Sequence, residues 1–168
     1  MTKLKLVNIG GEEKSFIELG ANLKENKGHS LQVIDFSKNN IGNKGMLSLG
    51  EAIQIWPHSL KSLNLSSCHL TDKGITALAY ALDKSYGMSL SLEELVLSGN
   101  NLGQAGTAVL EAWCANVKSY SNLKKLHLAN TNLVLTAFPA LKLLSKIVDI
   151  DFSGNRYKFL LLTFHKRK

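Results

Sequence analysis

Apolar residues recur along the chain in one spaced pattern, L-x-x-L-x-L-x-x-N-x-L, in which Ile, Val or Phe replaces some of the leucines. Five copies begin at Leu31, Leu60, Leu92, Leu123 and Ile147, at intervals of 29, 32, 31 and 24 residues. A weaker copy near Met1 has Leu4 and Leu6 at the two central apolar positions. Self-similarity at this period is typical of solenoids, in which each repeat buries its flanks on its neighbours.

The central L-x-L of each copy predicts a short strand, because successive side chains of a strand point to opposite faces. Leu63 and Leu65 are expected in the core, and Asn64 between them is expected to point outward. The Asn of the pattern ends the strand, where its amide can bond backbone groups left open by the turn. The residues at this structural position are Asn39, Cys68, Asn100, Thr131 and Asn155.

A helix is expected behind each strand. In three repeats a glycine (Gly45, Gly74 or Gly106) precedes apolar residues at helical spacing, which predicts one buried stripe per helix. These stripes are Met46, Leu49 and Ile53, then Ile75, Leu78 and Leu82, then Val109, Leu110 and Trp113. Residues 16–23 are the expected helix of the first repeat, and Pro139 predicts a short or irregular helix over 138–144.

Strand–helix repeats of this length belong to the long class of leucine-rich repeat. The predicted fold is therefore an α/β leucine-rich repeat solenoid, a right-handed horseshoe arc with parallel strands on its concave face and helices on its convex face. It has five clear repeats and a partial N-terminal one, over residues 1–157. Residues 158–168 form an apolar and basic tail. Apolar residues at both ends lead us to expect a piece of a longer solenoid.

The net charge of +7 gives little support to a nucleic-acid partner, because five of the charges lie in the last thirteen residues, 156–168. The tail suggests two roles, a cap on the open end of the solenoid or a contact with an anionic membrane, and the cap is favoured.

The start shows no signal peptide, and no run of apolar residues approaches the length of a membrane span. A cytoplasmic location follows, and two cysteines are too few for a disulfide framework.

With the repeats laid out, the chain resembles the CARMIL family of actin capping-protein regulators, in the middle of their long repeat domain. The resemblance runs from about Leu6 to Tyr157 and rests on segments such as LQVIDFSKNNIGNKGMLSLGEAI and NLKKLHLANTNL. Ribonuclease-inhibitor-like proteins and tropomodulins share much of this consensus. The resemblance implies a lipid-binding domain before the repeats, a dimerising helical segment after them and a capping-protein motif further on. None of these is visible in the sequence, so only the scaffold is carried over.

The outward strand positions are the candidate contact surface for a partner. Its members are Asp35, Asn64, Glu94, Val96, Lys125, His127, Asp149 and Asp151. Aromatic anchors, which dominate many tight interfaces, are missing from this set. His127 is expected to form an exposed cross-strand ion pair with Asp149 or Asp151, since a zinc site would need three or four ligands.

No nucleophile with a base beside it, phosphate-binding loop or metal-ligand spacing can be recognised. Cys68 and Cys114 are interpreted as buried structural residues rather than reactive thiols. We therefore expect no enzyme, no cofactor and no metal, but a cytoplasmic scaffold for protein partners in actin regulation, at the cytoskeleton, cell cortex or plasma membrane. A homodimer is expected only through the full-length protein. The alternative is a ribonuclease-inhibitor-like or NLR-type module that recognises a protein ligand.

Overall fold

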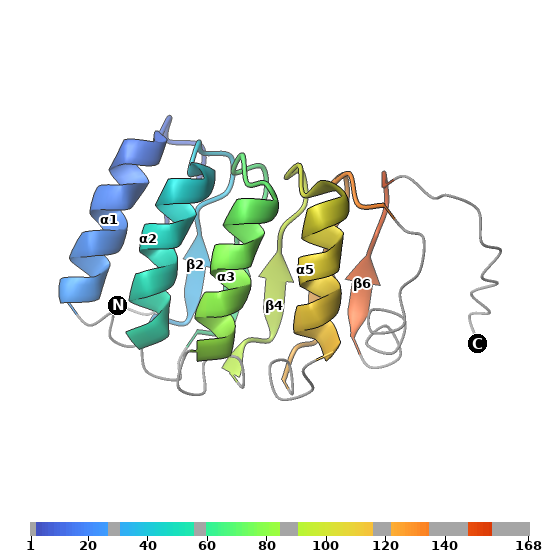
Figure 1. Ribbon diagram of the computed structural model, residues 1–168. Coiled ribbons are helices and arrows are strands. Elements are labelled where there is room, and N and C mark those ends of the chain that lie inside the picture. Colours follow the sequence, from blue (N-terminus) through green and yellow to red (C-terminus); the bar gives the residue numbers. More distant parts are fainter. Residues whose placement is uncertain are drawn as a thin grey trace, which may run out of the picture.

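Strands and helices alternate along the chain in the computed structural model, which describes residues 3–26, 31–55, 60–84, 91–115, 122–134 and 148–155. The helices are α1 (Glu13–Glu25), α2 (Gly42–Ile55), α3 (Asp72–Lys84) and α5 (Gly103–Ala115). The strands are β1 (Lys3–Lys5), β2 (Val33–Asp35), β3 (Ser62–Asn64), β4 (Glu94–Val96), β5 (Lys125–His127) and β6 (Asp149–Asp151). The helices lie on one side of the sheet (Figure 1), and none of the described helices lies on the other side.

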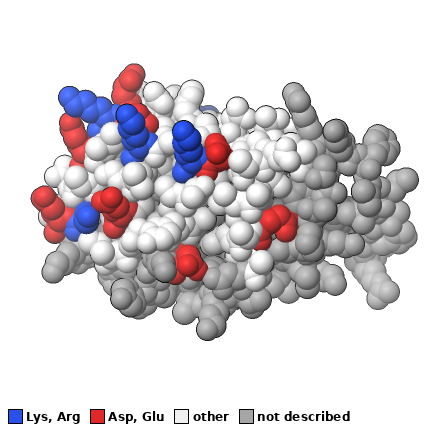
Figure 2. All heavy atoms as spheres, in the orientation of Figure 1, with Lys and Arg blue, Asp and Glu red and all other residues white. Residues whose placement is uncertain are grey.

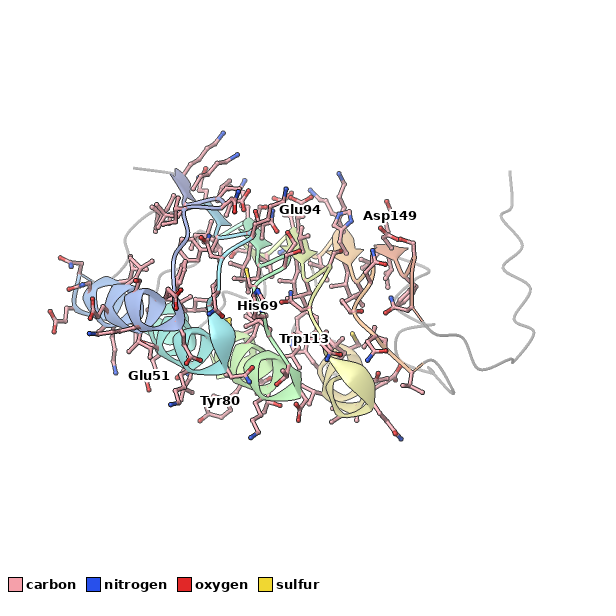
Figure 3. The ribbon with its side chains drawn as sticks, turned by 90° about the horizontal axis from the view of Figure 1, so that it is seen from above. Glu51, His69, Tyr80, Glu94, Trp113 and Asp149 are labelled. Carbon is pink, nitrogen blue, oxygen red and sulfur yellow. The ribbon has the colours of Figure 1, made fainter. Side chains whose placement is uncertain are left out.

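The six strands form one sheet in chain order, and each neighbouring pair is parallel. The register keeps equivalent residues side by side, so that Leu63 pairs with Ile34 on one side and with Leu95 on the other. Figure 3 shows the strands on the inner side of a gentle arc and the helices spread along its outer side. This confirms the predicted solenoid, including the first repeat with its own strand and helix.

The core lies between the sheet and the helices. The central strand residues Leu63, Leu95 and Leu126 are at most 1% exposed, and the predicted helix stripes face them. In the first two repeats the rings of Phe16 and Phe36 pack edge to face with centroids 5.5 Å apart. Burying one such side chain stabilises the fold by roughly 1.5–3 kcal/mol, so a core shared between neighbouring repeats keeps the solenoid together.

The helix α1 is longer at both ends than the predicted 16–23, and the glycines that precede the apolar stripes of the other helices lie inside the first turn of each helix. α2 starts at Gly42 and contains Gly45, and α5 starts at Gly103 and contains Gly106. A Cβ on Gly106 would come within 2.7 Å of the Leu102 Cβ, and one on Gly45 within 3.1 Å of Ile41. The glycines therefore let each helix begin directly against the turn that precedes it.

Asn100 shows how the turns of neighbouring repeats are joined. Its side chain is buried, and its Oδ1 accepts hydrogen bonds from the backbone N–H groups of Cys68 (2.9 Å) and Leu70 (3.0 Å). Its Nδ2 donates to the carbonyl oxygens of Leu65 and Leu97, both at 2.8 Å. One amide thus satisfies four buried backbone groups in two repeats. Asn39 and Asn155 make equivalent bonds to the repeats before them.

Cys68 and Thr131 alternate with these asparagines and join the repeats differently. The Cys68 thiol donates to the Phe36 carbonyl oxygen (3.3 Å), and the Cys68 carbonyl accepts from the N–H of Gly42 (3.1 Å). Thr131 donates its hydroxyl to Leu128 within its own repeat, while its carbonyl accepts from the N–H of Leu102 (2.9 Å). Neither side chain therefore bridges the turns through an amide as the asparagines do, although other side chains, such as Asn43 with Thr71, also join these repeats.

Both cysteines are buried as predicted. Burial raises the pKa of the Cys68 thiol and that of the Cys114 thiol to about 12. The irregular helix predicted over 138–144 and the tail over 158–168 lie outside the described residues. No helix among the described residues is long and apolar enough to cross a membrane.

Candidate interaction surface

The outward side chains of the strands form two straight rows across the sheet, which together we call the concave face. The register places Lys3, Val33, Ser62, Glu94, Lys125 and Asp149 in the first row, and Lys5, Asp35, Asn64, Val96, His127 and Asp151 in the second. Neighbours within a row are about 5 Å apart at the backbone. All the residues predicted for the contact surface lie in these rows, and their role in binding stays a prediction.

Glu94 is the centre of the polar contacts in this face. Its carboxylate accepts a hydrogen bond from the Ser62 hydroxyl (2.9 Å) and lies 3.8 Å from His127 Nε2. The expected ion pair of His127 with Asp149 or Asp151 was therefore wrong in its partner. His127 belongs to β5, which lies between β4 and β6. The side chain of Glu94 on β4 is longer than that of an aspartate on β6, and it reaches the His127 ring. Figure 3 shows Glu94 and Asp149 on the strand side of the molecule, opposite the helices.

The second row also closes the turns that follow its strands. Asp35 Oδ1 accepts from the Ser37 hydroxyl (2.7 Å) and N–H (3.1 Å), and Asn64 bonds Ser66 in the same way. Asp151 accepts from the Ser153 N–H (2.9 Å). Sequence reasoning missed this role, although the repeated D/N-x-S spacing signals a side-chain turn.

The pKa of Asp151 is lowered from its ordinary value, first by the backbone hydrogen bond from Ser153 and then by the Ser153 hydroxyl, with a smaller contribution from His127. Asp151 therefore stays charged on the open surface down to acidic pH.

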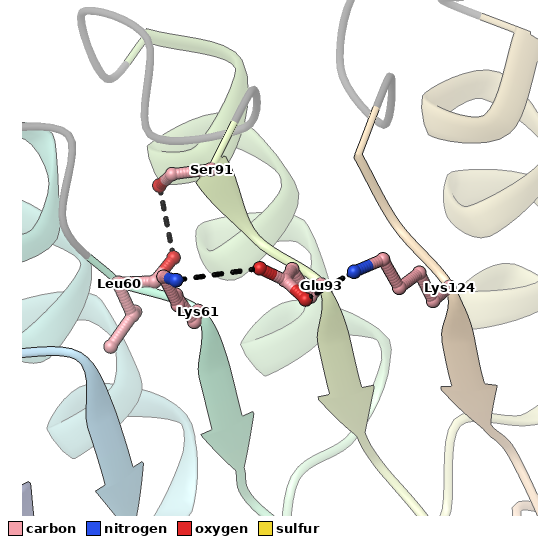
Figure 4. Close-up of polar contacts among 5 residues, drawn as sticks. All are labelled: Leu60, Lys61, Ser91, Glu93 and Lys124. Atoms are coloured by element: carbon pink, nitrogen blue, oxygen red, sulfur yellow. Dashed lines mark hydrogen bonds and ion pairs between the residues drawn. The ribbon is translucent and has the colours of Figure 1, made fainter.

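A ladder of charges runs along the edge of the sheet where the strands begin, at the residues before the first row. Lys124 Nζ lies 2.6 Å from one oxygen of Glu93, and Lys61 Nζ lies 3.7 Å from the other (Figure 4). The hydrogen bond and charge of Lys124 are the main causes that lower the pKa of Glu93. These side chains are well exposed, so the ladder contributes little to stability and adds a polar border to the concave face.

The outer surface of the helices has a different chemistry. Two hollows flank α3, of about 490 Å³ against α2 and about 360 Å³ against α5. Tyr80 and Thr76 line both hollows, and Trp113 lines the second. Charged atoms are most numerous over α1 and α2, whereas over α3 and α5 a few charged side chains surround a largely uncharged middle (Figure 2). Sequence reasoning did not consider this side.

The arrangement offers hydrogen bonds, charges and apolar hollows. Among the described residues no three His, Cys, Asp or Glu side chains come together as a metal-binding group. The two described thiols are buried and strongly protonated.

A single parallel sheet in chain order, a helix behind each of the first four strands and the asparagines that join the turns define a leucine-rich repeat solenoid. The family model described as "Leucine Rich repeat" matches residues 29–50, 57–79 and 89–108. The chain thus carries leucine-rich repeats of the class that the sequence pattern predicts.

Relatives include proteins of two kinds. The chain is 30% identical to the Rho GTPase-activating protein gacW of Dictyostelium discoideum over 93% of its length, and 30% identical to Protein CARMIL of the same organism over 91%. It is 32% identical over 75% of its length to the human NACHT, LRR and PYD domains-containing protein 13. The resemblance to CARMIL is thereby confirmed, and an NLR-type relative is present as well.

A solved structure of Leiomodin-1 Actin-Binding Site 2 has the same fold, with a TM-score of 0.66 at 17% identity, over 88% of this chain and 79% of that one. The chain spans only 14% of the length of gacW and of Protein CARMIL, and 12% of the human relative. The likeness shows a shared repeat architecture, and repeats of this kind serve as interaction modules.

Proposed function

We propose that this chain is a non-catalytic interaction module of a larger regulator of actin assembly, which binds a protein partner on its concave face. The activity is to hold that partner in place. In this proposal, the larger protein regulates actin capping protein, as a CARMIL-like protein does. A position at the cytoskeleton or cell cortex follows from this role.

The observation that carries the proposal is the pair of registered polar rows. Six strands present equivalent positions at one repeat spacing, which makes a rigid and extended surface for a macromolecule. Between β4 and β6 this surface carries Glu94, His127 and Asp151 beside Lys125 and Asp149, so that charges of both signs lie within two rows. Such a pattern selects partners by electrostatic complementarity.

Actin is the first partner to test, because Protein CARMIL is a relative and the leiomodin neighbour is an actin-binding site by its printed title. Co-sedimentation of the 168-residue chain with filamentous actin, and pull-down with monomeric actin, are expected to show binding. The double variant Asp149→Lys/Asp151→Lys should weaken that binding at least about tenfold, because it reverses the charge at two neighbouring positions of the concave face.

The matched control carries a charge reversal on the helix side. Lys44→Glu changes an exposed lysine of α2 and should leave actin binding within about twofold of the unaltered chain. No binding to either form of actin would refute the actin role, and equal loss in both variants would refute the concave face as the site. Pull-down with capping protein should fail, because the capping-protein motif of CARMIL proteins has no counterpart here.

The NLR-type alternative is supported by the 32% identity to a human NACHT, LRR and PYD protein. It uses the same concave face for a different protein ligand. The reading frame around the chain separates the two roles. A nucleotide-binding domain upstream favours the alternative, while a lipid-binding domain upstream and a basic, proline-rich stretch downstream favour the CARMIL-like regulator.

A further inference from the structure

The first repeat leaves apolar side chains open at its end of the solenoid. Its core leucines are only partly buried, whereas their counterparts in the second repeat, Ile34, Phe36, Leu49 and Ile53, are at most 3% exposed. Ile9, in the turn after β1, is 59% exposed. This end lies at β1 and α1, beyond which the described part of the chain has no further strand or helix (Figure 1). We call the following residues the apolar end: Leu4, Leu6, Ile9, Leu19 and Leu23.

The outer edge of β1 presents backbone groups beside the apolar end. In the second repeat the carbonyl oxygens of Asp35 and Ser37 face the preceding strand, where they accept from the N–H groups of Leu6 (2.8 Å) and Asn8 (3.0 Å). By the register of β1 with β2, the equivalent carbonyls of the first repeat are those of Lys5 and Val7, which therefore point away from β2. Backbone groups along the edge of a sheet are a template for a further strand.

Two lysines determine the charge of this edge. Lys3 and Lys5 are exposed on either side of Leu4, at the ends of the two rows of the concave face. A strand added at the edge has its outward residues about 5 Å from these lysines, and its inward residues beside Leu4 and Leu6. A segment that alternates acidic outward residues with leucine-sized inward ones therefore matches the edge in charge and in polarity.

The same lysines disfavour a second copy of this chain at the edge. Two β1 strands related by a twofold axis through Leu4 run antiparallel, so that Lys3 of each copy lies opposite Lys5 of the other. Like charges directly opposite each other destabilise a strand pair, and lysines at an edge are a common way to keep two edges apart. The edge is therefore suited to a partner of opposite charge.

Ile9 disfavours a further leucine-rich repeat as the occupant. At the equivalent position of each later repeat the side chain makes hydrogen bonds in the turns, as shown by Asn39, Cys68, Asn100, Thr131 and Asn155. Asn39 in this way donates to the carbonyl oxygen of Leu6 (2.6 Å) in the repeat before it. The isoleucine side chain has no hydrogen-bonding group to offer a preceding turn. An occupant that supplies a strand without such a turn fits better.

We infer that the open edge of β1 binds an extended, acidic and apolar segment of another protein, which adds to the sheet as a further strand. Main-chain hydrogen bonds along the edge give affinity, and the alternating contacts with Lys3, Leu4, Lys5 and Leu6 give specificity. One short strand makes a contact at the small end of specific interfaces, so the dissociation constant falls in the range of about 10–500 μM. The concave face between β4 and β6 stays open when the segment is bound.

Fluorescence anisotropy of a labelled peptide, Ser-Glu-Leu-Asp-Leu-Ser-Gly, titrated with the 168-residue chain tests this site. The basic peptide Ser-Lys-Leu-Lys-Leu-Ser-Gly has the same apolar residues and should bind at least about tenfold more weakly. The double variant Lys3→Glu/Lys5→Glu should reverse this preference, with at least about tenfold weaker binding of the acidic peptide and at least about tenfold tighter binding of the basic one.

Alternate N-methylation of the acidic peptide tests the added strand itself. Methyl groups on every second backbone nitrogen block the N–H groups that face β1 in one phase, and those that face solvent in the other. One phase should therefore weaken binding at least about tenfold, while the other leaves it within about threefold. Unchanged binding in both phases would overturn the inference, because the peptide would then adhere without joining the sheet.

Lys125→Glu is the matched control, because Lys125 is an exposed lysine in the same outward row as Lys3, but on β5. It should leave the affinity for the acidic peptide within about twofold. All the altered positions are exposed, and circular dichroism checks that each variant folds. Equal binding of the two peptides, no binding at about 1 mM chain, or equal loss in the control would overturn the inference.

Two further results would assign the edge to another occupant and so overturn the inference. One is a dimer of the unaltered chain in sedimentation equilibrium that Lys3→Glu/Lys5→Glu removes. The other is at least about tenfold tighter binding when the acidic peptide is extended by Asn-Asn-Leu, as in the turn after β4, because that would indicate a further leucine-rich repeat. None of these results bears on the proposed actin role, which depends on the concave face between β4 and β6.

Discussion

The concave face and the surface over α3 and α5 are built from the same repeats but differ in how their side chains are used. On the concave face the polar groups contact one another or the turns, as Glu94 contacts Ser62 and His127, and Asp35 contacts Ser37. On the outer surface an exposed tyrosine stands between two hollows, with one charge near each end of the helix. The first surface is suited to electrostatic recognition and the second to packing.

The difference shows how one solenoid can carry two surfaces of different chemistry on the same repeats. Each repeat fixes the outward residues of its strand by register, whereas the exposed residues of its helix are set only by what the core leaves outside. The strand side can therefore vary in charge without loss of fold, and the helix side can vary in shape. Both depend on the turns that join strand to helix.

The strongest way to disturb both surfaces together is to remove the side chain of Asn100. Asn100→Ala leaves four buried backbone groups without their partners and should lower the free energy of unfolding by about 3 kcal/mol or more, measured by urea denaturation. Cys68→Ala, at the equivalent position one repeat earlier, loses only weak sulfur bonds and should cost about 1 kcal/mol. Equal losses would show that the two kinds of joint do not differ.

The two thiols should be nearly inert in the folded chain. Because burial raises their pKa to about 12 from 9.0, the folded chain at pH 8 should react with Ellman's reagent at least about 100-fold more slowly than the urea-unfolded chain. The same shift predicts that stability is full below pH 9 and falls as the pH rises toward 12, since only the unfolded chain ionises readily in that window. Fast labelling of either cysteine in the folded state would contradict the packing described here.

Acid should act on the concave face through Asp151. Its pKa is lowered in the folded chain, so its stabilising contribution is present above the ordinary value of 3.8 and is lost as the pH falls through the folded value. Compared with Asp151→Asn, the unaltered chain should be slightly more stable above about pH 5, and this difference should shrink as the pH falls below about 4. Urea titrations at several pH values measure this, and a difference that is just as large in acid would point to a role of Asp151 other than its charge.

The smallest effect is expected at the edge ladder. Glu93→Gln removes both ion pairs with Lys61 and Lys124, yet the exposed lysines regain water, so the urea midpoint should not move beyond experimental error. Added salt should likewise leave the midpoint of the unaltered chain unchanged. A clear loss of stability would mean that the ladder stiffens the edge of the sheet.

The strands, their register and the asparagines that join the turns were predictable from the sequence, because every repeat has the same spacing of apolar and polar residues. Leu63 and Leu65 must face the core and Asn100 must satisfy the turn, and the spacing of the pattern carries both facts. The role of Gly45 was less predictable, since a Cβ at this position would come within 3.1 Å of Phe16 in the preceding repeat. A contact between repeats cannot be read from the pattern inside one repeat.

The candidate site was predictable in its positions but not in its contacts. The register placed Asp149, Asp151 and His127 where the strand pattern predicts them, while the partner of His127 depended on side-chain reach across two neighbouring strands. The exposed positions of α3 were not predicted, because the apolar pattern specifies only the residues that the helix buries. Their regular spacing is nevertheless present in the sequence, at Lys73, Thr76, Tyr80 and Asp83.

The central claim is that the concave face between β4 and β6 is the surface that contacts the partner. Amide hydrogen exchange of the chain, with and without saturating actin, tests it most directly. Added protection in segments 93–98, 124–129 and 148–153, with α1 unchanged, is the predicted result. Protection confined to the helices, or no change with actin at saturation, would contradict the claim.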